Sequence, residues 1–165
     1  MSKLWKFSNA YDFRKGKFAD IYRFYVIECS VEGVSRRGRS FKERGILLQH
    51  LNRELRQQSP FLNTEWYVLP QSEIEAFCER NGIQEGGSLK KEIIIQTNSK
   101  KSKTENLFYC IRNAFAHGAF EMHKHNNKMY YALENRYKGK LKSRMLIQEQ
   151  TLLDWMQLVR KATTK

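Results

Sequence analysis

The segment from Thr104 to His117 constrains the fold most, because its large apolar side chains recur at helical spacing and the pattern then stops. At about 100° per residue, five apolar side chains fall on one arc of about 120°. These residues are Leu107, Phe108, Ile111, Ala114 and Phe115. Gly118 is suited to the position just after a helix. The sequence therefore predicts a buried helix that ends at Gly118.

Beyond Gly118 the apolar residues follow a period of two, which predicts a hairpin that turns at Asn126 and Asn127. A further strand follows this hairpin. Helical spacing elsewhere predicts helices over residues 17–31, 40–58, 73–82 and 148–162. Ser72 and Glu75 have the spacing of a capping box for the third of these helices. Residues 88–98 contain three consecutive isoleucines, which fit a helix or a strand, and we favour a helix.

These elements predict one domain over residues 1–165, of a length that can bury a single core. We expect a mainly α fold, a helical bundle with a small antiparallel hairpin or sheet before the C-terminal helix. Cys29, Cys78 and Cys110 are widely spaced among apolar neighbours, which indicates reduced core thiols. We expect no metal and no cofactor.

The net charge of +13 favours association with a polyanion. Nucleic acid is the favoured partner, with anionic lipid or an acidic protein as alternatives. No segment resembles a lipid-seeking amphipathic helix, a membrane span or a signal peptide, and we expect a cytoplasmic protein.

Arg112, Asn113 and His117 lie on the opposite side of the predicted helix from its core arc. One interpretation is a helix end, since cations favour the negative pole of the helix dipole. Another is a site for a phosphodiester. An imidazole titrates near neutral pH and a guanidinium binds phosphate through a rigid fork of donors. Both interpretations place the three residues near the end of the helix.

The segment RNAFAH, residues 112–117, resembles the R-x4-H motif of the HEPN superfamily in its R-N-x-x-x-H form. The order of elements from Lys103 onward is also similar to small stand-alone HEPN proteins of bacterial plasmids and defence loci. The resemblance implies a metal-independent endoribonuclease, a toxin or antiphage effector, that works as a homodimer with both motifs in one cleft. RNA would be cut to a 2′,3′-cyclic phosphate and a 5′-hydroxyl, and DNA would resist.

Residue by residue, the resemblance implies that His117 transfers protons, Arg112 stabilises charge on the phosphate and Asn113 orients by hydrogen bonding. Some HEPN toxins carry a tyrosine two residues after the histidine, which a partner nucleotidyltransferase modifies. Ala119 occupies that position here. The sequence therefore does not support that form of control, and whether an antitoxin exists stays open.

Basic residues form further candidate RNA contacts. Arg136, Lys138, Lys140, Lys142 and Arg144 occupy every second position, so one strand would present all five on one face. The alternative is protection of an exposed sheet edge. Lys100, Lys101 and Lys103 lead into the motif helix, and residues 35–40 form another basic loop; for both segments the alternative is a solvated loop.

Other candidates have less support. His123 and His125 are two apart but lack further metal ligands nearby, and His50 is expected to be structural. A non-catalytic HEPN-like module that binds RNA or protein remains the alternative function. A DNA-binding regulator has little support, because no helix-turn-helix spacing is present.

Overall fold

The computed structural model describes residues 17–29, 41, 45–57, 65–83 and 92–162. The helices in this part of the chain are α1 (Phe18–Tyr22), the π-helical segment η1 (Arg23–Glu28), α2 (Leu48–Gln57), α3 (Gln71–Arg80), α4 (Lys103–Ala116) and α5 (Glu149–Ala162). The strands are β1 (Glu65–Leu69), β2 (Glu92–Gln96), β3 (Phe120–His125), β4 (Lys128–Tyr137) and β5 (Lys140–Gln148). Within these ranges, no helix has the length and apolar character that crossing a membrane requires.

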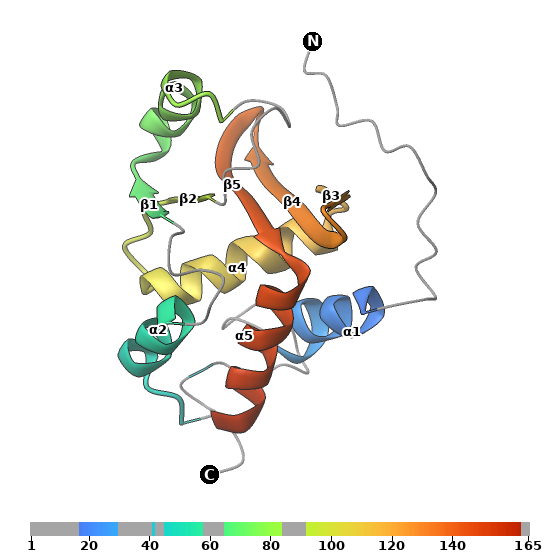
Figure 1. Ribbon diagram of the computed structural model, residues 1–165. Helices are drawn as coiled ribbons and strands as arrows, with labels where there is room; N and C mark the ends of the chain where they lie inside the picture. The colour runs from blue at the N-terminus through green and yellow to red at the C-terminus, as the bar shows by residue number, and fades with distance from the viewer. Residues whose placement is uncertain (1–16, 30–40, 42–44, 58–64, 84–91, 163–165) are drawn as a thin grey trace.

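The five strands form one mixed sheet in the order β1-β2-β5-β4-β3. β1 and β2 are parallel, and α3 lies between them in the chain, so these three elements form a βαβ unit. The other neighbouring strands are antiparallel. The late strand β5 therefore lies in the middle of the sheet, between β2 and β4 (Figure 1).

The expectation of a mainly α, HEPN-like helical bundle is wrong, because the chain has a mixed α/β fold. The error arises at Ile93, Ile94 and Ile95, which form β2 and not the favoured helix. Both faces of this strand are covered. Ile93 and Ile95 belong to the main core, whereas Ile94 packs in a second cluster with α3. A strand buried on both faces has a continuous apolar run without period-two alternation.

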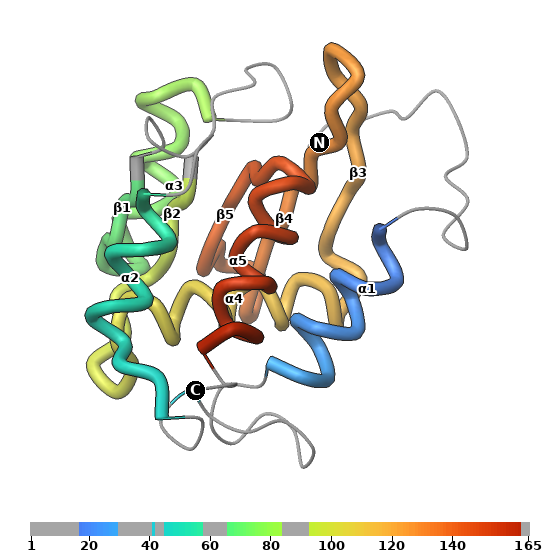
Figure 2. The backbone as a smooth tube through the Cα atoms, turned by 60° about the horizontal axis from the view of Figure 1, so that its bottom comes forward, coloured from blue at the N-terminus to red at the C-terminus, as the bar shows by residue number. Residues whose placement is uncertain are grey.

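Helices cover the sheet unequally. The segments α1, η1, α2, α4 and α5 contribute to the main core on one face, while α3 packs on the other face against β2 and β5 (Figures 1 and 2). The buried indole of Trp155 donates a hydrogen bond to the carbonyl of Leu55 at 3.2 Å. Tyr25 donates to the carbonyl of Leu152 at 2.7 Å. These bonds satisfy the polar atoms of two of the largest core side chains.

Several local predictions are confirmed. The β3–β4 turn contains Asn126 and Asn127, both at positive φ. The C-terminal helix is α5, and the first predicted helix corresponds to α1 and η1. The three cysteines are buried and free.

The predicted capping box at Ser72 is wrong, because Pro70 is the N-cap of α3 and Ser72 lies inside the helix. Glu75 instead accepts a hydrogen bond from the backbone of Leu141 at 3.2 Å. The predicted helix from residue 40 is observed only from Leu48. Residues 42–44 and the basic loop at 35–40 lie outside the described residues.

Side-chain amides hold α4 across the sheet. The Asn135 amide, on β4, donates to the carbonyl of Cys110 and to the hydroxyl of Ser143, each at 2.7 Å. Nearer the N-terminus of the helix, the amide of Asn106 donates to the carbonyl of Gln96 on β2. The helix that carries the motif is therefore bonded to β4 and β2 as well as packed against the sheet, and the bond from Asn135 to Ser143 extends this network to β5.

We expect Asn135→Ala to lower the free energy of unfolding by about 1–3 kcal/mol, because it leaves the carbonyl of Cys110 and the hydroxyl of Ser143 without their donor. Urea denaturation followed by tryptophan fluorescence measures this change. Gln150→Ala, on the exposed surface of α5, is the control and should remain within about 0.5 kcal/mol of wild type. Equal effects of the two substitutions would contradict the anchoring role of Asn135.

Candidate functional site

The two ends of α4 are fixed by specific caps. Ser102 and Glu105 form a capping box at the N-terminus, which the sequence analysis did not identify. At the C-terminus, Ala119 N–H bonds the carbonyl of Ala114 at 2.8 Å and Gly118 N–H bonds that of Phe115 at 3.2 Å. This is a Schellman motif, with Gly118 at φ 66° in the left-handed region. The predicted helix end at Gly118 is therefore confirmed.

The predicted division of α4 into two faces is also confirmed. The five apolar residues of the predicted core arc are all buried. Arg112 and Asn113 are half-buried, and His117, at the C-cap, is exposed. Tyr109 and Ala116 are half-buried between them along the same strip of the helix. The three motif residues therefore lie on an accessible strip that begins beside the core.

Arg112 is held by a neutral partner. Its Nη1 donates to the side-chain oxygen of Asn113 at 2.9 Å. Its Nε is buried and has no hydrogen-bond acceptor within the described part of the chain. No carboxylate in that part forms an ion pair with this guanidinium, so its charge is not neutralised there. A buried donor without an acceptor is costly to the folded state.

His117 presents its imidazole at the end of the same strip. No hydrogen bond or ion pair with another described residue engages its ring. On the helix, Arg112 and His117 are five residues apart, which separates them by about 140° around the axis. One copy of α4 therefore presents its guanidinium and its imidazole at opposite edges of the accessible strip.

The expectation that five alternating cations share one strand face is wrong. Lys138 and Gly139 form the turn between β4 and β5, both at positive φ. Arg136 therefore belongs to β4, and Lys140, Lys142 and Arg144 belong to β5. Lys142 is one extra residue between the Asn135–Ser143 and Arg136–Leu141 pairs, which is a β-bulge. The bulge breaks the alternation of faces along β5.

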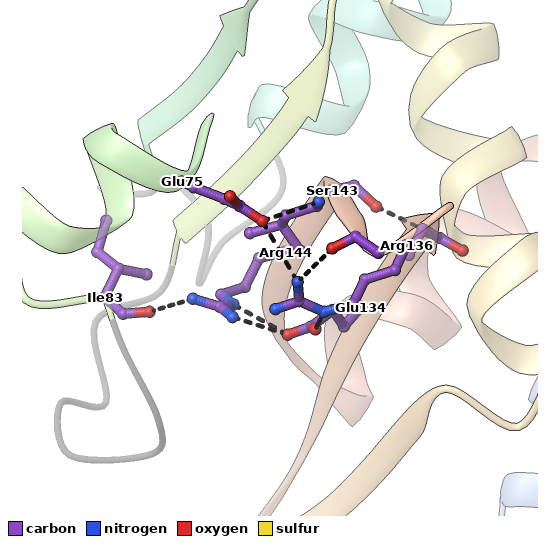
Figure 3. A network of polar contacts seen from close by, with 9 residues as sticks. Glu75, Ile83, Glu134, Arg136, Ser143 and Arg144 are labelled. Atoms are coloured by element: carbon purple, nitrogen blue, oxygen red, sulfur yellow. Dashed lines mark hydrogen bonds and ion pairs between the residues drawn. The ribbon is translucent and has the colours of Figure 1, made fainter. Parts of the chain in front are cut away.

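Two of the five cations form ion pairs (Figure 3). Arg144 donates two bonds to one carboxylate oxygen of Glu134, at 2.9 and 3.1 Å, and a third to the carbonyl of Ile83 at 3.0 Å. Arg136 pairs with Glu134 and, at 3.3 Å, with Glu75 on α3. These contacts join α3 to the β4–β5 hairpin, so Arg136 and Arg144 are structural in this arrangement.

The three lysines of the hairpin remain without a carboxylate partner in the described residues. Lys138 and Lys142 place their Nζ atoms 5.5 and 5.8 Å from the ring centroid of Tyr137. Lys140 is exposed and pairs across the strands with Tyr137. The sequence analysis missed Tyr137, although an aromatic residue within a basic run was a visible signal.

The structure separates the remaining basic candidates from His117. Lys100, Lys101 and Lys103 lie at the N-terminal end of α4, so the helix places them about 20 Å from His117 along its axis. Lys101 lies 5.2 Å from the ring of Tyr109. These lysines therefore extend the basic surface along α4 but do not adjoin the motif of the same chain.

The other polar candidates do not form a site. Within the described residues, no group of three His, Cys, Asp or Glu side chains is arranged to hold a metal ion. The rings of His123 and His125 stack with centroids 6.5 Å apart. His50 is exposed and pairs with Glu54 at 3.1 Å, and is not part of the core. Burial raises the pKa of the Cys110 thiol to about 11, which makes it a poor nucleophile at neutral pH.

Comparison of the chain with protein-family models, curated proteins and solved structures finds no match.

We expect Arg112→Met to keep the free energy of unfolding within about 0.5 kcal/mol of wild type, or to raise it, because the substitution removes a buried donor that has no acceptor in the described residues. Arg144→Met is the matched control, and should cost about 1–3 kcal/mol because it removes both donors to one carboxylate oxygen of Glu134 and the donor to the carbonyl of Ile83. Urea denaturation measures both. A similar loss for the two variants would mean that Arg112 has a structural partner.

Proposed function

We propose that the protein is a metal-independent endoribonuclease that acts through Arg112, Asn113 and His117. The observation that carries this proposal is the state of the two charged or titratable groups: Arg112 has a neutral amide partner and a spare buried donor, and His117 is exposed at the helix end. The resemblance to HEPN proteins now rests on the local motif and not on the architecture, because the fold is mixed α/β.

Each residue has a distinct chemical task in this proposal. The guanidinium of Arg112 binds the scissile phosphate and stabilises the charge that develops on its oxygens. Asn113 orients that guanidinium through the 2.9 Å hydrogen bond. His117 removes the proton of the ribose 2′-OH or donates one to the leaving 5′-oxygen. The attack of the 2′-oxygen gives a 2′,3′-cyclic phosphate and a 5′-hydroxyl.

A second copy of the chain completes the site in this proposal. The reaction needs one group that accepts a proton and one that donates a proton, whereas the motif supplies one imidazole per chain. The 140° separation of Arg112 from His117 also limits how one chain engages both sides of a phosphate. A two-fold axis beside α4 brings together two copies of the strip.

We place the enzyme in the cytoplasm, as a toxin or antiphage effector.

We expect purified wild-type protein to cut single-stranded RNA in the presence of EDTA, and His117→Ala or Arg112→Ala to lower the rate at least 100-fold. Gel electrophoresis of end-labelled RNA measures the rate and identifies the cyclic phosphate ends. His125→Ala removes an exposed imidazole on β3 and is the matched control, with an expected rate near that of wild type. An all-deoxy substrate of the same sequence should remain intact.

Loss of cutting with EDTA, or wild-type rates for His117→Ala, would overturn the proposed mechanism. RNA binding without cutting by the wild-type protein would instead favour the alternative, a non-catalytic RNA-binding module.

Mixing Arg112→Ala and His117→Ala subunits tests the dimer. Partial recovery of the rate in the mixture is expected if one cleft contains residues of both copies.

A further inference from the structure

Tyr137 is unusual among the described side chains. Three large hydrophobic residues are exposed in that part of the chain, namely Ile27, Leu47 and Tyr137, and only the last is aromatic. Tyr137 is 61% exposed and is the final residue of β4. An exposed aromatic ring at a strand end costs apolar hydration and contributes no core packing here.

The surroundings of Tyr137 are cationic. Lys138 and Lys142 lie within 6 Å of its ring, and Lys140 is its cross-strand neighbour. Both arginines of the hairpin are engaged by Glu134 and Glu75, so the lysines carry the unpaired charge at the tip. Proteins that bind single strands combine an aromatic ring, on which a base stacks, with cations that contact the adjoining phosphates.

The backbone of the turn supports a functional role for Lys138. This residue has φ 50°, a left-handed conformation that favours Gly and Asn. The β3–β4 hairpin has Asn126 and Asn127 at its turn, at φ 47° and 60°. Lysine is a poor choice for a turn of this kind. A role of its charge in binding would explain why a residue that is unfavourable for the turn occupies this position.

Hydrogen bonds and an ion pair also connect the tip to α3. Arg136 donates to the carbonyl of Gly139 at 3.2 Å and pairs with Glu75 (Figure 3). The same Glu75 oxygen accepts the backbone N–H of Leu141 at 3.2 Å. Both sides of the turn are therefore bonded to α3 through one carboxylate. A surface that is ordered before binding loses less conformational entropy when a ligand binds.

We propose that the tip of the β4–β5 hairpin binds single-stranded nucleic acid, with one base stacked on Tyr137 and adjoining phosphates on Lys138, Lys140 and Lys142. This inference deepens the proposed function and rests on its RNA substrate. The backbone N–H of Glu134 bonds the carbonyl of Ala119, two residues after His117. Tyr137 follows three residues later on β4, about 10 Å along the strand. We call Tyr137 and the three lysines around it the platform. One strand of RNA can therefore reach both this platform and the end of α4.

Fluorescence anisotropy with a labelled 12-nucleotide oligodeoxythymidine tests the platform, because this probe has stacking bases but no 2′-OH to be cut. We expect Tyr137→Ala to weaken binding about 5- to 150-fold and Tyr137→Phe to stay within threefold of wild type. Leu47→Ala removes another exposed apolar side chain and should have no effect. A duplex of equal length should bind less tightly than the single strand.

Lysine variants distinguish the tip from general charge. Lys138→Asn is expected to raise the melting temperature, because asparagine suits the turn, while reducing the salt dependence of binding by about 0.7 in log–log slope. Lys138→Ala with Lys140→Ala should weaken binding more than Lys124→Ala with Lys128→Ala, which removes equal charge from the exposed β3–β4 hairpin (Figure 2).

Wild-type affinity in Tyr137→Ala, equal losses in the two double-lysine variants, or tighter binding of the duplex would overturn the platform. These outcomes are separable from failure of the nuclease. A protein that binds through Tyr137 but never cuts RNA retains the platform and loses the proposed enzyme. A protein that cuts RNA but binds normally without Tyr137 retains the enzyme alone. Preference for an acidic peptide over the oligonucleotide would overturn the choice of ligand.

Discussion

The position of α4 depends on hydrogen bonds from side-chain amides to main-chain carbonyls. Asn135 bonds the carbonyl of Cys110, within the helix, and Asn106 extends from the helix to the carbonyl of Gln96 on β2. Apolar packing alone is non-directional and permits a helix to slide or rotate on a sheet. Directional bonds to buried partners fix the register. The core arc and the accessible strip of α4 both follow from that register.

Specific polar contacts also decide which cations of the β4–β5 hairpin are structural and which remain on the surface. Glu134 and Glu75 engage the two arginines of the β4–β5 hairpin, and these ion pairs join α3 to the sheet. Charge in this region is thus divided between structure and surface. Arginine suits the first task because its planar fork bonds several acceptors at once, whereas lysine is a hydrated point charge on a flexible stem. A count of basic residues conceals this division.

Local features of the fold followed from the sequence where one physical rule was sufficient. Gly118 and the Asn126–Asn127 turn depend on the left-handed backbone, which few residues adopt readily. The core face of α4 follows from helical spacing. The βαβ unit could not be predicted from the sequence, because the strand Ile93–Ile95 is buried on both faces and its apolar run has no periodicity. The β4–β5 turn was missed because Lys138 is atypical there. The ion pairs of Glu134 and Glu75 depend on tertiary proximity that spacing alone does not reveal.

The central position of β5 has a consequence for biosynthesis. β2 emerges from the ribosome well before β5, its antiparallel partner. One edge of β2 therefore stays unpaired until nearly all of the described domain has been synthesised. Ser143, which shares the amide of Asn135 with Cys110, also lies on β5. A nascent chain that ends before β5 can form local helices and the β3–β4 hairpin, but it lacks the strand that joins the two parts of the sheet. The accessible strip of α4 therefore acquires its final geometry only after β5 has been synthesised.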